Sequence, residues 1–413
     1  MSFGDLQFSE TDARKIQASF QRIYEEIRRA NGDPGFRLAA GAPERLVQLT
    51  ESAVVTQVAA DIDKTGKGNL LFFAGEDTME HIGYLYGERG RRMAASYALT
   101  TMRYRLSVER PVKTPIPQGY RSTPDNKVFF KTLKTLEIPP GELYGDVEAQ
   151  CLTPGSEGDG FEVGQIKNMV DLVPFVASIE NITPTSGGAD VEGLEEYRER
   201  LRLLPESFSV AGPDGAYEFW ARSANPSIVD AKAWMPELDM EAFAEFLAPW
   251  GISDAAGFYK ALGDYYRESG TGPGNVNVTA LMKDGELPSE EILDQVKETL
   301  TPTKRRPLTD YVHVVPPETK EFGVEVQYWI ETERATEAAS IIDAVDKAVG
   351  RYIAWQRSRL GLDILPDLLH KLIMDCGVKR MDIIAPTFTV LKPNEVSQFN
   401  GLRAVTFMGL EDA

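Results

Sequence analysis

The sequence of 413 residues has few of the side chains that most often bind metals or act as nucleophiles. It contains two cysteines, Cys151 and Cys376, and three histidines, His81, His313 and His370. The cysteines lie too far apart for a metal-spaced pair, and two cysteines make no disulfide framework. No histidine has a second histidine at the spacing of a zinc site, and no G-x-S-x-G motif is present. We therefore expect no metal, no cofactor, no catalytic residues and a function other than that of an enzyme.

Positively charged residues are outnumbered by negatively charged ones. The chain has 44 Lys and Arg residues against 63 Asp and Glu residues, which gives a net charge of −19. Nucleic-acid binding needs a basic face, and an anionic membrane surface repels an acidic protein, so we expect neither partner. The sequence has no apolar run of transmembrane length and no apolar signal segment at its start. We expect synthesis in the cytoplasm.

Two motifs resemble binding loops without meeting their requirements. Residues 61–72 begin like a calcium-binding EF-hand loop, but the position of the bidentate glutamate is occupied by Phe72. We interpret this segment as an irregular helix end. The glycine-rich segment 158–164 lies among turns and not between a strand and a helix, so it does not predict a phosphate-binding loop. Pairs of carboxylates of the kind glycosidases use occur by chance in so acidic a chain.

The first hundred residues predict helices with exposed apolar stripes. A helix capped by Ser9 ends at Asn31-Gly32, a second begins near Pro43, and a short third begins near Ile82. A terminal helical arm has little of its own domain against which to bury apolar side chains, so we expect these stripes to bind a partner protein. The predicted interface residues are Ile16, Phe20, Ile23, Ile27, Leu46, Leu49, Val54 and Val58.

The remaining chain predicts a multidomain α+β protein. Prolines, glycines and alternating β-branched residues follow residue 104, and further on strands alternate with helices. We expect an N-terminal helical arm, a small all-β domain and two sandwich-like domains with mixed or antiparallel sheets. The predicted ranges are 1–104 for the arm, 105–187 for the β domain, 188–316 for the central domain with an insertion at 235–272, and 317–413 for the C-terminal domain.

Individual elements follow from the same patterns. We expect strands at 127–138, 227–234, 275–282, 310–315, 323–330, 378–386 and 388–393, and helices at 288–300, 339–359 and 366–376. Segment 183–190, rich in glycine, threonine and proline, predicts a hinge.

Residues 190–234 resemble the central signature of the Baseplate J family. The signature is a charged acidic helix, a turn of the form A-G-x-x-G-A-Y, and a helix that ends before a strand; here Gly212, Gly215, Ala216 and Tyr217 carry the match. Further stretches between residue 44 and the C-terminal helix and hairpin are also similar, so the resemblance covers most of the chain. Two features depart from the family pattern: the long insertion at 235–272, and Asp159 where an asparagine is usual.

The resemblance implies a structural subunit of a baseplate wedge in a contractile tail-like machine, linking wedges around the central hub and transmitting the contraction signal. It implies a homodimer within the wedge, another wedge protein as a partner, and contacts with neighbouring wedges and with proteins near the hub and sheath. It implies no catalytic residues, and a turn formed by Gly212, Gly215 and Tyr217 that determines the fold, because glycine permits the backbone angles of a tight helix entry.

Two other functions stay open at this point. A tail-associated cell-wall hydrolase would need a cleft with paired carboxylates or a bound metal. A receptor-binding or glycan-binding tail component would need an exposed aromatic platform, and the five tryptophans are scattered along the sequence. The sequence does not distinguish a phage tail from a tail-like bacteriocin or an injection system.

Overall fold

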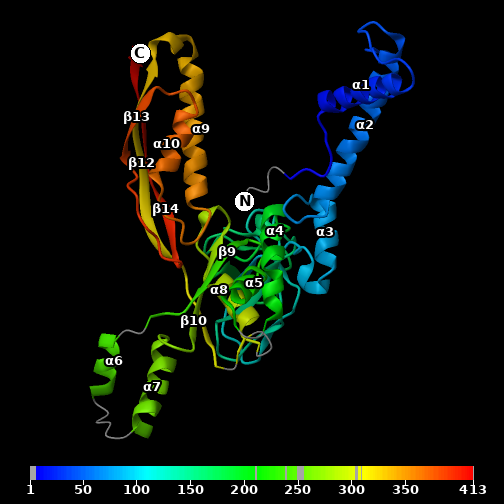
Figure 1. Cartoon of the computed structure of the whole chain (residues 1–413). Coiled ribbons are helices and arrows are strands. Elements are labelled where there is room, and N and C mark those ends of the chain that lie inside the picture. Colours follow the sequence, from blue (N-terminus) through cyan, green and yellow to red (C-terminus); the bar gives the residue numbers. More distant parts are fainter. Residues whose placement is uncertain are drawn as a thin grey trace. The chain divides into compact units, whose positions relative to one another are not determined.

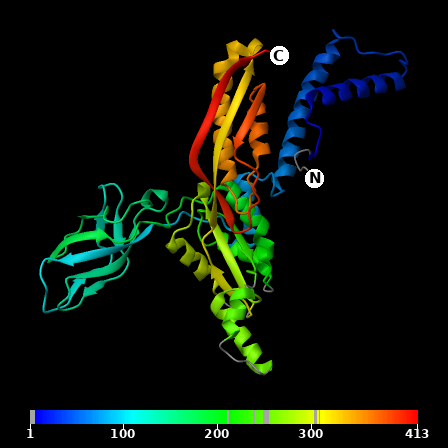
Figure 2. The same cartoon turned by 90° about the vertical axis from the view of Figure 1, so that its left-hand side faces the viewer.

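A computed structural model describes residues 6–209, 212–237, 240–248, 255–302, 306–307 and 309–412 (Figures 1 and 2). The chain divides into two compact units, Met1–Arg92 and Met93–Ala413. The first is helical and the second contains every β-sheet of the described residues. The prediction of an α+β chain with mixed sheets is confirmed in this general form, and the predicted domain boundaries stay a prediction. No helix in these ranges is long and apolar enough to span a membrane.

The N-terminal unit contains helices α1 (Ala13–Ala30), α2 (Pro43–Gly68) and α3 (Glu76–Tyr84), followed by a 3-10 turn, η2 (Gly87–Gly90). Helix α1 packs against α2. The predicted cap of α1 is wrong: the Asp12 side chain accepts from the Arg14 amide, whereas the Ser9 hydroxyl donates to the carbonyl of Ala59 in α2. The predicted start of α3 is also too late, because two acidic residues at Glu76 and Asp77 stabilise its first turn.

The segment that begins like a calcium loop contains the end of α2 at Gly68 and then turns, so its interpretation as a helix end is confirmed, although its residues up to Gly68 are regular helix. Local pairing stabilises this last part of the helix. One Asp63 oxygen lies 2.7 Å from the Lys67 ammonium one turn later, and the other accepts from the Phe8 amide at 2.8 Å. These contacts hold the pKa of the Asp63 carboxyl below its usual value, chiefly through the Lys67 hydrogen bond.

The second unit begins with a barrel-like sheet. Six strands pair in the order β7-β3-β4-β6-β1-β8, and β2 and β5 form a separate pair. The bounds are β1 Leu99–Leu106, β2 Thr114–Ile116, β3 Arg121–Thr123, β4 Phe130–Thr132, β5 Leu136–Ile138, β6 Tyr144–Cys151, β7 Asn168–Met169 and β8 Val176–Asn181, with a 3-10 turn, η3, at Ser156–Gly158. The predicted strand at 127–138 is therefore two short strands. Alternate residues of the strands form an apolar core that includes Met102, Tyr104 and Phe130.

The next sheet has the order β11-β10-β9, with β9 (Ile228–Trp234) antiparallel and β11 (Tyr311–Val314) parallel to β10 (Asn275–Met282). Helix α5 (Asp214–Arg222) packs against β9 and against α8 (Glu290–Leu300). Helix α4 (Leu194–Leu203) and the turns η4 (Leu204–Phe208) and η6 (Lys283–Gly285) complete this part. The insertion at 235–272 contains α6 (Met240–Leu247) and α7 (Ala255–Ser269), and its residues 238–239 and 249–254 lie outside the described residues.

The last sheet has the order β13-β12-β14. Strand β12 (Glu318–Glu331) pairs antiparallel with β13 (Arg380–Ala385) and parallel with β14 (Glu395–Glu411). Helices α9 (Ala338–Gln356) and α10 (Pro366–Met374) follow the 3-10 turn η7 (Thr332–Glu337) and share one apolar core with the sheet. The predicted strand at 388–393 is wrong: only Thr389 pairs, in an isolated bridge with Ile364.

Candidate functional site

The most unusual surface of the N-terminal unit is helix α2, whose apolar side faces outward. Its buried positions are Gln48, Ser52, Ala59 and Asp63, three of which are polar. Four β-branched side chains at spacings of seven, four and four residues share another side of the helix, about 100° round from the buried positions. They are Val47 (58% exposed), Val54 (60%), Val58 (52%) and Ile62 (53%). Figure 1 shows α2 as the long helix of this unit.

This arrangement reverses the amphipathic pattern of a surface helix, in which apolar residues face the core. Burying such a side chain fully stabilises by about 1.5–3 kcal/mol, so covering these half-exposed residues would contribute about 1 kcal/mol each. The outward stripe of α2, defined as Val47, Val54, Val58 and Ile62, is therefore a surface suited to a protein partner.

The predicted interface residues divide into two groups. Ile23, Ile27, Leu46, Leu49, Val54 and Val58 are exposed, and Phe20 is half-buried. Ile16 is buried inside the N-terminal unit, so its prediction as a free interface residue is wrong. The reason is that α1 packs on α2, and the start of the α1 stripe is covered by its own unit. Val47 and Ile62 of the outward stripe are not among the predicted interface residues.

The predicted turn ties α5 to the segment before β11. Gly212 has φ +76°, and a Cβ there would lie 2.9 Å from the Pro307 ring, so glycine is needed on both counts. A Cβ on Gly215 in place of hydrogen would lie 2.9 Å from Glu206. The hydroxyl of the buried Tyr217 donates to Asp310 at 2.6 Å. Burial, and then this hydrogen bond, raises the pKa of the Tyr217 hydroxyl.

A buried ion pair that the sequence did not predict joins Glu192, just before α4, to Arg200 in the last turn of that helix. The Arg200 guanidinium donates two hydrogen bonds of 2.7 Å to the two oxygens of Glu192, and both side chains are nearly fully buried. Glu192 also accepts from the Met93 amide at 3.0 Å, which fixes the chain just before β1 to this helix. The sequence offers one signal: Arg200 lies three residues after the aromatic Tyr197 and therefore on the same face of the helix.

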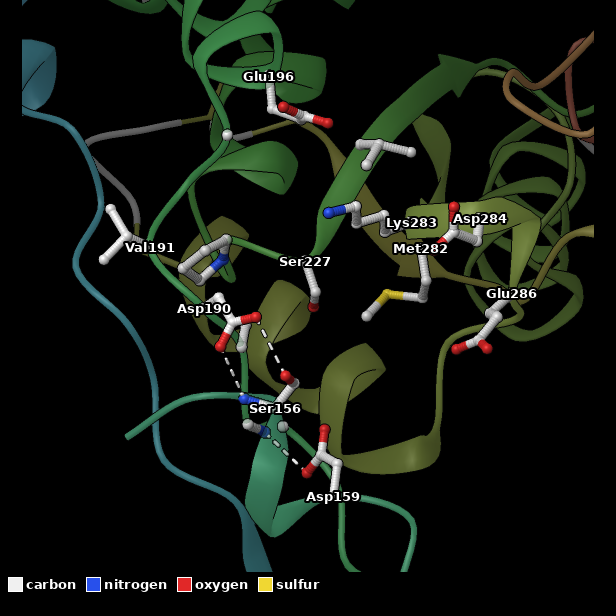
Figure 3. A pocket seen from close by; sticks show the side chains of 16 residues that line it. Ser156, Asp159, Asp190, Val191, Glu196, Ser227, Met282, Lys283, Asp284 and Glu286 are labelled. Carbon is white, nitrogen blue, oxygen red and sulfur yellow. Dashed lines mark hydrogen bonds between the residues drawn. The ribbon is translucent and has the colours of Figure 1, made fainter. Parts of the chain in front are cut away.

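A cavity of about 250 Å³ lies beside the predicted hinge (Figure 3). The Asp190 carboxylate accepts from the Ser156 amide and hydroxyl, both at 3.1 Å, and Asp159 accepts from the Gly188 amide at 3.0 Å. Burial raises the pKa of Asp159 to about 6. The Ser227 hydroxyl donates to Asn225 and not to a base. These contacts fasten the chain between the barrel-like sheet and α4.

Within the described ranges, no group of three or more His, Cys, Asp or Glu side chains could hold a metal ion. The carboxylates of Asp159 and Asp190 beside this cavity accept backbone hydrogen bonds and so position segment 187–190.

Comparison with known proteins agrees with this architecture. Residues 105–188 match the family model of the Baseplate J-like protein barrel domain, and residues 209–316 match that of the Baseplate J-like central domain. Baseplate protein J of Escherichia phage P2 is 25% identical over 246 residues, which are 59% of this chain and 68% of the relative. A chain in the cryo-EM structure of the anti-feeding prophage baseplate, 6-fold symmetrised, has 10% sequence identity and a TM-score of 0.37, over 92% of this chain and 90% of that chain. The two matched domains and the phage P2 relative show that the chain belongs to the Baseplate J family.

Proposed function

We propose that this chain is a structural baseplate subunit of a contractile tail-like machine, in which it forms part of a wedge. The proposal rests on the family and on the outward stripe of α2. In this role the chain is made in the bacterial cytoplasm, is incorporated into the baseplate and catalyses no reaction.

The outward stripe of α2 is the observation that carries the proposal. Spacings of seven and four residues bring Val47, Val54, Val58 and Ile62 onto one seam, as in helices that pack side by side with a partner helix. A second copy presents the same seam and can pack by twofold symmetry. We place a homodimer contact here, extended by a helix of another wedge protein. Ile23 and Ile27 of α1 are further exposed apolar side chains of the same unit.

Transmission of the contraction signal requires parts that move together. Between the central and C-terminal sheets, Asp230 accepts from the Leu360 amide at 3.0 Å and Gln398 donates to the Gly285 carbonyl at 2.6 Å. Leu281, Leu360 and Val396 form a small buried cluster at the same place. These contacts support a rigid link that carries displacement from one sheet to the other.

The test places charge on the seam. Replacing Val54 and Val58 together by Asp should leave the purified chain folded, because both side chains are more than half exposed. The same change should abolish incorporation of the chain into particles, because an unpaired charge in an apolar interface is strongly unfavourable.

A matched control is Lys64→Glu, which changes the net charge by the same two units at an exposed position of the same helix that is not part of the stripe. It should assemble like the unmodified chain. Normal incorporation of the Val54→Asp, Val58→Asp variant would contradict the proposed interface, and complete particles that lack this chain would contradict the proposed function itself.

A further inference from the structure

The end of the barrel-like sheet farthest from its chain entry carries a second exposed apolar surface. Strand β1 leads away from the entry and ends at Leu106, and β6 and β8 begin at this same end. Three loops meet there, at 107–113, 139–143 and 170–175. They are joined by hydrogen bonds from the Ser107 amide to the Phe175 carbonyl (2.9 Å), from the Leu106 amide to the Leu143 carbonyl (2.7 Å) and from the Gly141 amide to the Arg110 carbonyl (3.0 Å).

Five large apolar side chains on these joined loops are exposed and not buried in a core. They form what we call the barrel tip: Val108 (58% exposed), Val112 (54%), Leu143 (46%), Leu172 (80%) and Phe175 (51%). Single exposed apolar residues are ordinary, but five on three connected loops make a patch of the kind that binds other proteins.

The backbone at Phe175 gives an independent indication. Its φ is +70°, in the left-handed region that disfavours bulky residues and favours glycine or asparagine. Strained backbone of this kind occurs preferentially at binding sites, where it presents a side chain. The Phe175 ring is half-exposed and so contributes little to the core of the sheet. The strain holds an aromatic ring at the surface.

The charges around the tip indicate the partner's chemistry. The Arg110 guanidinium stacks on the Phe175 ring at 3.8 Å and donates to the Thr114 hydroxyl at 3.3 Å. No carboxylate of the described residues lies within ion-pair distance of it, whereas Arg103 and Arg105 are paired with Asp146 and Glu180. Arginine is enriched among the residues that dominate binding energy at protein interfaces, and the Phe175 ring holds this guanidinium in place.

We propose that the barrel tip inserts into an apolar hollow of a neighbouring protein of the particle, and that a carboxylate at the rim of this hollow pairs with Arg110. The inference rests on the proposed function, because the partner is sought among the particle's own proteins. A membrane is the less favoured occupant, since the net charge of −19 opposes approach to an anionic surface.

The test places a photoreactive benzoylphenylalanine at Leu172 of the full chain in assembled particles, with Lys134 as the control position. Lys134 is an exposed residue on the flank of the same sheet. Irradiation should crosslink position 172 to one particle protein, identified by mass spectrometry. The variant Phe175→Asn should reduce this crosslink about thirtyfold, as expected for the loss of a central aromatic anchor. Its melting temperature should stay unchanged or rise, because asparagine tolerates the backbone conformation.

Other outcomes overturn the proposal. Crosslinking at position 134 but not at 172 would show that the tip is free in the particle. An undiminished crosslink in the Phe175→Asn variant would show that the Phe175 ring is not part of the interface. Binding of the purified chain to phosphatidylglycerol vesicles that is lost on Leu172→Asp would assign the tip to a membrane. Particles without the chain would instead refute the proposed function.

Discussion

Replacing Glu192 by Gln should strongly destabilise the second unit. Glu192 and Arg200 are joined by two hydrogen bonds of 2.7 Å, with side-chain exposures of only 2% and 3%. Glutamine keeps the size of the side chain but removes its charge and turns one acceptor into a donor that faces the guanidinium. Leaving one charge of a buried pair uncompensated costs about 3–5 kcal/mol.

The assay is equilibrium unfolding in urea, followed by circular dichroism, with Glu199→Gln as the matched control. Glu199 pairs with Arg202 at 2.8 Å on the same helix, but both side chains are exposed, so its loss should leave the midpoint nearly unchanged. The double variant Glu192→Leu, Arg200→Met should be more stable than Glu192→Gln, because no buried charge is left unpaired. Equal midpoints for Glu192→Gln and Glu199→Gln would refute the reasoning.

Two further predictions concern buried contacts elsewhere. The pKa of Asp159 is raised to about 6, so the folded state favours its protonated form and the contribution of this group to stability is lost as the pH rises from about 4 through 6. Unfolding midpoints measured at pH 4 and pH 8 should show that Asp159→Asn gains stability relative to the unmodified chain as the pH rises; a constant difference would contradict the assignment. In the N-terminal unit, a Cβ at Gly66 would lie 2.6 Å from the Phe8 ring, whereas one at Gly68 would meet Thr78 at an ordinary 3.6 Å. Hydrogen exchange at the Phe8 amide should accelerate in Gly66→Ala and not in Gly68→Ala; equal rates would show that Phe8 does not need this close approach.

Much of the secondary structure follows from periodicity in the sequence. The predicted strands at 227–234 and 275–282 agree with β9 and β10, and the helix predicted at 288–300 agrees with α8. In these segments the local pattern and the tertiary environment favour the same structure. Strand β14 was missed because two irregularities in its pairing with β12 interrupt the alternation, near Gly401 and Gly409, both of which have positive φ.

The candidate surfaces were harder to predict than the elements. The sequence shows that α2 has apolar stripes, but only tertiary packing decides that Gln48 and Asp63 face inward and Val54 outward. Arg200 lies in a highly charged segment that predicts a solvated helix, and its burial depends on Glu192 and Met93, which the fold brings together. The barrel tip depends on three loops that are distant in sequence.

The central claim, that the outward stripe of α2 is covered by protein in the particle, can be measured through solvent access at Val54. A cysteine at position 54 should react with a soluble maleimide in the free chain and be protected in assembled particles, as read by peptide mapping of that position. A cysteine in place of Lys64, an exposed residue of the same helix outside the stripe, should react in both. Equal reactivity of position 54 in the free chain and in the particle would contradict the account.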